Sequence, residues 1–383
     1  MILSAITLTN FRNHAATVVK FAPGINAVLG KNGQGKTNLL EAVSYVGLTK
    51  SFYAASDRDV LRFGAEEFTI DARIASDAGV EHRVGVRYTR GPSGKSVAVD
   101  GSEQARLASV IGRFPVVILS PEHGAITSGG PAERRKFMDV TLSQVAAAYL
   151  DDVMEYRRAL RQRNRILSDG LQRGAPPAAV IEPWTESLAR YGGRIAFRRR
   201  AFVEEFRAYV RDAYRSILPP EGEATDAEEP GLAYECGFPA EAETTAEGMT
   251  DRMAAALASR RLEEQRRGIT LMGPHRDEIH LTINGINVQH FASQGQHKTI
   301  LVALKIAEYQ YMRERRQEAP LLLLDDVFSE LDTVRARRIL DVTLAMGQSV
   351  ITATDERAFG GSIGWGDRNR RFTVEHGTCK PAA

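Results

Sequence analysis

The stretch Gly30-Lys31-Asn32-Gly33-Gln34-Gly35-Lys36-Thr37 decides the fold of this chain, because it matches the pattern GxxxxGK[ST] at every fixed position. The apolar run 25–29 precedes it, and residues 38–48 follow with helical spacing. A loop that wraps a phosphate must point several backbone N–H groups inward, and glycine reaches the required angles at low cost. The strand–loop–helix context predicts a phosphate-binding loop in an α/β domain and disfavours a chance glycine-rich turn.

The residue types in this loop suit a nucleotide triphosphate. Lys36 carries a charge that reaches the β- and γ-phosphates, the Thr37 hydroxyl is a hard oxygen ligand for Mg²⁺, and the next helix adds its positive end. The loop alone does not name an activity, because kinases, GTPases, motor ATPases and transporters all contain it. The predicted nucleotide contacts of this segment are Gly30, Lys31, Asn32, Gly33, Gln34, Gly35, Lys36, Thr37 and Asn38.

A second acidic site follows the buried run 321–324. An apolar strand that ends in Asp325-Asp326 places a carboxylate at the sheet edge where open α/β sheets bind ligands. Asp325 suits an Mg²⁺ ligand, and Asp326 suits the general base for an attacking water. Because aspartate is one methylene shorter than glutamate, we expect slow turnover. Lys36, Asp325 and Asp326 are therefore the predicted catalytic residues, with Thr37 and Asp325 as the metal ligands; capping of the strand end by the two aspartates is the alternative.

Composition describes an ordinary globular chain of 383 residues, with 43% hydrophobic and 26% charged residues and a net charge of +2. No apolar stretch approaches the roughly 18 residues that a membrane helix needs, so we expect no membrane association. The first basic residue is Arg12, and no charged-then-apolar leader precedes it. Cys236 and Cys379 are far apart and form no CxxC, which argues against a disulfide framework or a cysteine-rich zinc site. These features predict a cytoplasmic protein with reduced thiols.

The pattern of apolar and polar residues changes twice along the chain. Strand patterns dominate to residue 119, where 115–119 predicts a strand of the kind buried at a sheet centre, and they return at 280–288 with the hairpin signal Asn284-Gly285. Helical spacing dominates between 133 and 213, as two helices joined by a loop at 168–183 that lie antiparallel. We predict one α/β domain, residues 1–119 and 269–383, split by a mainly helical insertion, residues 120–268, with an acidic mobile segment near 219–248.

The charges are segregated. From Ala132 to Arg215 there are 17 Lys/Arg against 11 Asp/Glu, whereas Ser216 to Asp251 holds ten acidic residues and no Lys or Arg. The basic part would attract a polyanion that the acidic part repels. On charge alone, solvated helix and loop faces remain the more economical interpretation.

Ser293-Gln294-Gly295-Gln296 begins a further predicted helix. A serine and a glycine at a helix start offer a hydroxyl and free N–H groups to an anion, although alone they indicate only an N-cap. The segment precedes Leu322 by 29 residues, and Ser329-Glu330-Leu331-Asp332 follows the acidic pair. This order is found in ABC-type ATPases.

These motifs together resemble the RecF family of DNA replication and repair proteins, a branch of the SMC-like ABC ATPases. The resemblance spans nearly the whole chain. Ser-Gln-Gly-Gln and Asp325-Asp326 depart from the Ser-Gly-Gly-Gln and Asp-Glu of the broader superfamily in a manner that looks typical of RecF-like proteins. The matching segments are 10–13 (NFRN), 30–38, 120–122 (SPE), 129–131 with Arg134-Arg135, 162–164 (QRN), 273–276 (GPHR), 293–296, 324–332 (LDDVFSELD) and 347–348 (GQ).

The resemblance implies a fold, a cofactor and an assembly. The fold would be an ABC-type P-loop ATPase head, a mixed sheet with flanking helices, with an inserted helical subdomain. ATP with Mg²⁺ would bind between two copies of the chain, so that Ser293, Gly295 and Gln296 of one copy close on the γ-phosphate held by the other. The implied activity is an ATP-dependent homodimer with a weak, DNA-stimulated ATPase.

The resemblance also implies partners. RecF-like proteins bind DNA at gaps or single/double-strand junctions and help RecO and RecR to load RecA, in DNA damage repair and the SOS response, which implies association with the nucleoid. Phosphate contacts would be sequence-independent and salt-sensitive. Arginines paired on the surface with Glu155, Glu204 and Glu205 are the alternative. The candidate contacts are Arg157, Arg158, Arg161, Arg163, Arg165, Arg198, Arg199 and Arg200.

Two other functions remain open from the motifs. The ATPase subunit of a transporter usually has a much shorter step between the phosphate loop and the signature serine than the 257 residues from Lys36 to Ser293. A small-molecule P-loop kinase leaves 293–296 and 329–332 unexplained.

Overall fold

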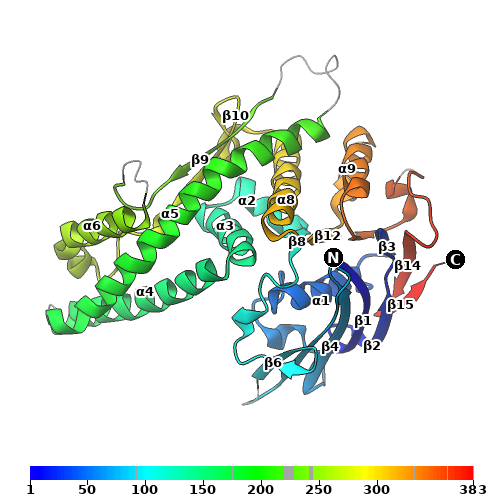
Figure 1. The fold of residues 1–383 in the computed structure, drawn as a ribbon, viewed down its shortest axis with the longest axis horizontal. Helices are drawn as coiled ribbons and strands as arrows, with labels where there is room; N and C mark the ends of the chain where they lie inside the picture. The colour runs from blue at the N-terminus through cyan, green and yellow to red at the C-terminus, as the bar shows by residue number, and fades with distance from the viewer. Residues whose placement is uncertain are drawn as a thin grey trace. The chain divides into compact units, whose positions relative to one another are not determined.

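The computed structural model describes residues 1–91, 94–174, 176–218, 228–240, 245–330, 333–359 and 361–382, without the side chains of residues 173, 329, 330 and 333. Contacts divide the chain into two compact units (Figure 1). The first contains Met1–Gly124, Asp212–Ala227 and Lys298–Ala383, and the second contains Ala125–Arg211 and Glu228–His297. Both units are discontinuous in sequence. Residues 269–297 belong to the second unit, whereas the sequence pattern predicted them in the α/β domain.

The first unit contains a mixed sheet that holds the phosphate loop. Its order is β15-β14-β3-β13-β12-β8, and all neighbours are parallel except β14 and β15. Leu324 pairs with Ile351 and Leu119, so the carboxyl ends of these strands lie at one edge. The strands are β3 (Ile25–Leu29), β8 (Val116–Leu119), β12 (Leu321–Asp325), β13 (Ser349–Ala353), β14 (Arg370–Glu375) and β15 (Thr378–Pro381).

A second, antiparallel sheet in this unit has the order β2-β1-β4-β5-β6-β7. Helix α1 (Lys36–Leu48) contacts strands of both sheets, which explains why almost all of its residues are buried. The strand patterns expected before residue 119 include an antiparallel meander formed by β4, β5 and β6. The strands are β1 (Ile2–Phe11), β2 (His14–Lys20), β4 (Glu67–Ala75), β5 (Glu81–Thr89), β6 (Gly94–Val99) and β7 (Ser102–Glu103).

Strand β8 is not at the sheet centre that its apolar run predicted. It is the last strand of its sheet in the described part of the chain, yet every residue of β8 is buried. Helix α1 packs on this edge so closely that a Cβ at Gly47 would lie 2.4 Å from the Phe114 carbonyl oxygen. A helix therefore provides the cover that a further strand would give.

Two helices flank β12 in the sequence. The helix predicted to begin near Ser293 is confirmed as α8 (Gln294–Arg316), and α9 (Thr333–Ala345) follows β12. Short 3₁₀ turns are η1 (Asp57–Val60), η2 (Leu107–Ser109), η3 (Pro121–Gly124), η4 (Pro274–Arg276), η5 (Val327–Glu330) and η6 (Glu356–Phe359). No helix among the described residues is long and apolar enough to cross a bilayer.

The second unit is built on two long helices, α4 (Ala147–Arg173) and α5 (Ala178–Ile217). Polar pairs at 149–199, 152–198 and 163–185 show that they run antiparallel, as expected (Figure 1). The loop predicted at 168–183 is wrong, because helix continues on both sides and only 174–177 separate α4 from α5. Burial of Leu167 and Ile181 outweighs the helix-breaking composition.

The insertion is less purely helical than expected. A three-stranded sheet, β11-β10-β9, crosses it, and Asn284-Gly285 form the hairpin turn between β10 and β11 with φ of 52° and 76°. Part of the acidic segment, 219–227 and 241–244, lies outside the described residues, whereas β9 occupies its middle. The elements are α2 (Ala125–Ser128), α3 (Pro131–Val145), β9 (Pro230–Glu235), α6 (Ala246–Arg267), β10 (Glu278–Ile283), β11 (Ile286–Asn287) and α7 (Val288–Phe291).

Candidate nucleotide site

A cavity of about 240 Å³ in the first unit joins the phosphate loop to the acidic strand end. The loop after β3, the end of β12 and the end of β13 meet there because parallel strands place their carboxyl ends at one edge. Two segments almost 300 residues apart thus form one pocket. Its lining residues are Asn32, Gly33, Gly35, Lys36, Thr37, Asn38, Asp325, Asp326 and Thr352.

Lys36 closes the loop on itself. Its ammonium group donates hydrogen bonds to the carbonyl oxygens of Gly30 and Lys31, at 2.7 and 3.2 Å. Burial lowers the pKa of Lys36, and the charges of Asp326 and Asp325 oppose this shift. The cation is therefore held in a buried position at the pocket, where a phosphate oxygen can take the place of the two carbonyl oxygens.

Thr37 and Asp325 form the part of the pocket that suits a divalent cation. The Thr37 hydroxyl lies 2.9 and 3.0 Å from the two carboxylate oxygens of Asp325, and the Thr352 hydroxyl donates to the same carboxylate at 2.7 Å. Burial raises the pKa of Asp325, although both hydroxyl bonds and the Lys36 charge oppose the shift. Hydroxyl and carboxylate oxygens fit Mg²⁺. Because no group of three His, Cys, Asp or Glu gathers among the described residues, phosphate and water would supply the other ligands.

Asp326 has an unusual backbone. Its φ is 50°, and its N–H donates to the Thr352 hydroxyl at 2.9 Å. Left-handed backbone is uncommon for residues other than glycine and costs roughly 1 kcal/mol or more. Thr352, which sequence reasoning missed, fixes the orientation of both aspartates. A hydroxyl residue at the end of the neighbouring parallel strand was the available signal.

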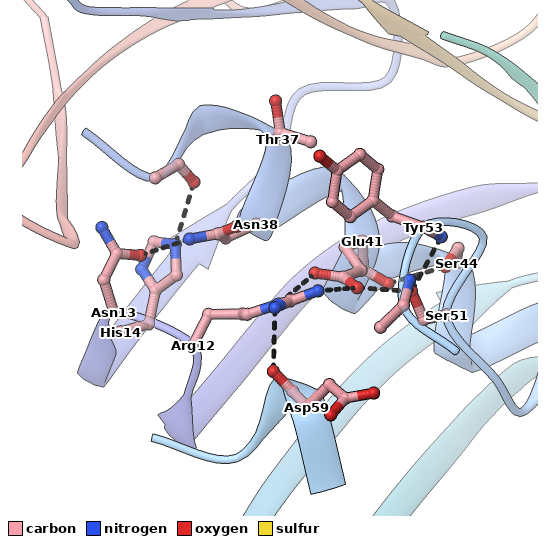
Figure 2. A network of polar contacts seen from close by, with 12 residues as sticks. Arg12, Asn13, His14, Thr37, Asn38, Glu41, Ser44, Ser51, Tyr53 and Asp59 are labelled. Atoms are coloured by element: carbon pink, nitrogen blue, oxygen red, sulfur yellow. Dashed lines mark hydrogen bonds and ion pairs between the residues drawn. The ribbon is translucent and has the colours of Figure 1, made fainter. Parts of the chain in front are cut away.

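Residues of the β1–β2 turn and of the β14–β15 turn hold the phosphate loop from outside the pocket, and we call them the outer clamp. The Asn13 amide donates to the Gln34 carbonyl oxygen at 2.8 Å. The Asn13 side-chain oxygen accepts from the Asn38 amide at 2.8 Å (Figure 2). Gln34 does not line the pocket; its carbonyl and side-chain oxygens accept from the N–H groups of Gly377 and His376. A Cβ at Gly377 would lie 2.1 Å from the Asn13 carbonyl oxygen, and its φ is +76°, so only glycine fits.

His14 and Arg12 extend this support on either side of the clamp. His14 is buried and contacts the Gly35 carbonyl oxygen at 3.1 Å. The Arg12 guanidinium makes two hydrogen bonds of 2.8 Å to Glu41 of α1, and the Ser51 hydroxyl also donates to Glu41 (Figure 2). The phosphate-binding helix is thereby tied to the β1–β2 turn by a charge that is buried and paired.

The signature segment is in the second unit, at the start of α8. Ser293 is exposed, and its hydroxyl accepts from the Gln296 N–H at 3.2 Å, while the Gln296 side chain accepts from the Ser293 N–H at 2.8 Å. This reciprocal pair is a capping box, the structural alternative that sequence left open. Gly295 lies between them in the first turn of the helix. A capped helix start presents its remaining N–H groups outward, which is compatible with a second role toward an anion.

The segment 324–332 is described only in part. Leu324 and Asp325 end β12, and 327–330 form η5. Leu331 and Asp332 lie outside the described residues, as do the side chains of Ser329 and Glu330.

Two of the candidate DNA-contacting arginines are inside the second unit. Arg163 is 2% exposed and binds Glu264, Thr185 and Thr270; Arg199 is 4% exposed and binds Asp139 and Asp277. A solvated polyanion cannot reach them without unfolding the unit. The expectation that these two arginines contact DNA is therefore not retained, because their role is to neutralise buried carboxylates.

The other candidate arginines remain at the surface. Arg157, Arg158, Arg161 and Arg165 are exposed along α4, within one third of the helix circumference by their spacing. Arg158 lies 3.8 Å from Glu155, an exposed pair of little energetic weight. Arg198 pairs with Asp152, and Arg200 donates to the Ala240 carbonyl oxygen. The α4 stripe of residues 157, 158, 161 and 165 is the strongest exposed basic feature among the predicted contacts.

Comparison with known proteins covers almost the whole chain. The family model described as "RecF/RecN/SMC N terminal domain" matches residues 2–374. A "DNA replication and repair protein RecF" of Salinibacter ruber is 43% identical over 94% of this chain and 86% of the relative. The protein of the same description from Chloroherpeton thalassium is 40% identical over 94% of this chain and 96% of the relative.

Solved structures agree with the sequence matches. The structure described as "recombination mediator protein RecF-ATP in RecFOR pathway" has a TM-score of 0.88 at 29% identity, covering 100% of this chain and 97% of that chain. An SMC head bound to a ScpA domain has a TM-score of 0.55 at 14% identity, covering 100% of this chain and 97% of that chain, and shares the fold alone. The expected ATPase-head fold is confirmed.

Proposed function

Because this chain belongs to the RecF family of DNA replication and repair proteins, we propose that ATP drives two copies of it together on DNA, at gaps or single/double-strand junctions. Slow hydrolysis then releases the dimer. The carrying observation is the pocket in which Lys36, Thr37 and Asp325 converge, together with the exposed serine-capped start of α8. The family assignment leaves no support for a transporter subunit or a small-molecule kinase.

ATP with Mg²⁺ is the proposed cofactor of this pocket. Lys36 would bind the phosphates, Thr37 and Asp325 would hold the cation, and Asp326 would accept the proton of the attacking water. The related structure with ATP supports the nucleotide assignment. A weak ATPase follows from the short Asp326 side chain, whose strained backbone has to be repositioned before it reaches a water.

Assembly is proposed to depend on the γ-phosphate. Ser293 and Gly295 of one copy would close on the phosphates held by residues 30–38 of the other, and ADP lacks the group that joins the two. The exposed α4 stripe would contact DNA phosphates. RecO, RecR and RecA are the proposed protein partners, acting in the cytoplasm at the nucleoid.

A mixing experiment tests the composite site. Lys36→Met removes the phosphate contact, and Ser293→Arg blocks the signature face while leaving the pocket of its own chain intact. If the site is shared, a mixed dimer contains one complete site, because the Ser293→Arg chain supplies the pocket and the Lys36→Met chain supplies the serine.

We expect neither variant alone to dimerise on gapped DNA with ATP, and the mixture to recover dimers, measured by sedimentation with two fluorescent labels. Recovery in the mixture only supports a shared site. Dimerisation of Lys36→Met alone contradicts gating by ATP, and an inactive mixture of two well-folded variants contradicts sharing. Ser293→Ala serves as the matched control for the added bulk of arginine.

A further inference from the structure

A cavity of about 250 Å³ lies within the second unit, among α3, α4, α5 and η4. Its walls are apolar where Val153, Leu160 and Pro274 line it, and Arg135, Lys136 and Arg157 line it with cationic groups. None of these six residues belongs to the nucleotide pocket. The volume is just below the roughly 300–1,000 Å³ typical of cavities for complete small-molecule ligands, so it suits one part of a larger ligand.

The carboxylates around this cavity are already neutralised. Asp139, which also lines it, accepts hydrogen bonds from Arg199 and Tyr149 at 2.7 and 2.6 Å and from Arg157 at 2.8 Å. Asp277, behind the wall, is bound by Arg199 and Tyr234. These bonds hold the Asp139 pKa below its usual range despite burial, so the carboxylate stays paired rather than free to repel an anion.

Arg135 carries a positive charge that remains after the carboxylates around the cavity have been paired. Its guanidinium donates to the Asp277 carbonyl oxygen at 2.8 Å, and no carboxylate forms a salt bridge with it among the described residues. Burial and the nearby Arg199 charge lower the Arg135 pKa. Lys136 also lines the cavity, and its ammonium nitrogen lies 4.0 Å from a carboxylate oxygen of the half-buried Glu133.

His275 adds no charge to the wall near neutral pH. Its Nδ1 lies 2.6 Å from the Tyr156 hydroxyl, its Nε2 lies 3.2 Å from the Thr270 carbonyl oxygen, and burial lowers its pKa to about 4. The positive potential of the cavity therefore comes mainly from Arg135 and Lys136, because Arg157 and Arg199 together offset the charges of Asp139 and Asp277.

We propose that this cavity binds one phosphodiester of a nucleic acid backbone. The phosphate would accept hydrogen bonds from the Arg135 guanidinium and from the cationic groups of Lys136 and Arg157. The sugar carbons would lie against Val153, Leu160 and Pro274. Arg157 also belongs to the exposed α4 stripe, so the cavity lies at one end of that stripe. A phosphate bound in the cavity would fix the register of the nucleic acid strand, which the exposed arginines of the stripe contact less specifically. This inference rests on the proposed DNA binding and names the position at which one phosphate is gripped.

Two variants of the full-length chain test the site by different means. Arg135→Gln removes the unpaired charge, and Ala132→Trp fills the cavity from an exposed position on its lining without removing a charge. Arg260→Gln is the matched control, because Arg260 is an exposed arginine of the same unit, on α6, paired with Glu263. Binding to gapped DNA is measured across a salt series, and the melting temperature is measured with inorganic phosphate at constant ionic strength.

We expect Arg135→Gln to weaken DNA binding about tenfold and to reduce the slope of log K against log salt by about one, the value for one lost phosphate contact. Ala132→Trp should weaken binding similarly, while Arg260→Gln matches the parent. If Arg135→Gln and Ala132→Trp both match Arg260→Gln, the inference is overturned while the proposed function stands.

If the parent chain itself shows no salt-dependent DNA binding, the proposed function fails and the nucleic-acid assignment fails with it. In that case the melting temperature measured with inorganic phosphate shows whether the cavity binds a free anion. A phosphate-dependent rise in the melting temperature that Arg135→Gln abolishes would point to a free anion instead of a backbone phosphate, and would overturn the inference in its stated form.

Discussion

The Thr37 hydroxyl lies 2.9 Å from a carboxylate oxygen of Asp325, although 288 residues separate the two in sequence. Asp325 is the last residue of β12, and Thr37 lies in the first turn of α1, after the loop that follows β3, so the parallel sheet brings the two together. This contact defines where a cation would sit, and it gives the first of four predictions.

Asp325→Asn should stabilise the nucleotide-free chain while abolishing its response to Mg²⁺ and ATP. Burial raises the pKa of Asp325, which means that its charge is costly in the folded state at neutral pH. We expect a melting temperature higher by a few degrees without nucleotide, and no further rise with Mg²⁺-ATP. The exposed Asp341→Asn is the control. A lower melting temperature for nucleotide-free Asp325→Asn than for the parent would contradict the prediction.

Gly377→Ala should weaken nucleotide binding from outside the pocket. The new Cβ would push against the Asn13 carbonyl oxygen and disturb the clamp on Gln34. Gly79→Ala is a matched control, because its φ of +79° imposes the same backbone strain and its Cβ would meet nothing within 4 Å. We expect Gly79→Ala to lose about 1 kcal/mol of unfolding free energy, Gly377→Ala to lose more because of the added clash, and Gly377→Ala alone to lose about tenfold in ATP affinity by calorimetry. Equal affinities would show that the clamp does not position the loop.

Arg163→Met should unfold the second unit more easily without changing DNA contacts. The Arg163–Glu264 pair is buried, so loss of one partner leaves a bare charge and costs about 3–5 kcal/mol of unfolding free energy in urea. The double variant Arg163→Met/Glu264→Gln should regain most of it. The exposed Arg161→Gln should instead keep stability and lower the salt slope of DNA binding by about 0.9. A salt slope that falls for the double variant would return Arg163 to the DNA surface.

His275 should make the second unit sensitive to mild acid. Its pKa is about 4 in the folded chain against about 6.5 when unfolded, so the unfolded state binds a proton first as the pH falls. Stability is therefore fully present above about pH 6.5 and is lost progressively toward pH 4, by up to roughly 3 kcal/mol.

The variant His275→Gln keeps one acceptor for Tyr156 and one donor for Thr270 and should flatten this dependence between pH 7.5 and 5. The exposed His290→Gln should leave the slope unchanged. Urea midpoints across that pH range are the measurement, and identical slopes for all three proteins would rule out His275 as the titrating group.

Sequence patterns anticipated the elements that carry strong periodicity or a fixed motif. The phosphate loop, β12 with its aspartates, α8 and the β10–β11 hairpin were all predictable, because the required residue types are local. Helix α6 was missed, since its buried positions are few and its sequence is largely polar. Strands β14 and β15 were missed as well, because β14 gains its place by pairing with β3, more than 340 residues earlier, and β15 by pairing with β14.

The candidate site shows the same division. Thr37 and Asp325 were identified by their chemistry, and Thr352 carried the same kind of signal but was missed, whereas the contacts of Asn13 and Gly377 with Gln34 became visible only in the structure. Burial of Arg163 and Arg199 was equally hidden, because the sequence of a basic helix does not tell whether an arginine faces water or a carboxylate 60 to 101 residues away.

Strand β3, which leads into the phosphate loop, lies between β13 and β14. Both of its neighbours come from the last 35 residues of the 383-residue chain. During synthesis on the ribosome, strand β3 therefore has neither of its neighbours until about 320 further residues have been made. A product that terminates before residue 349 would retain the glycine-rich motif yet lack the strands that support it, so we expect it not to respond to nucleotide.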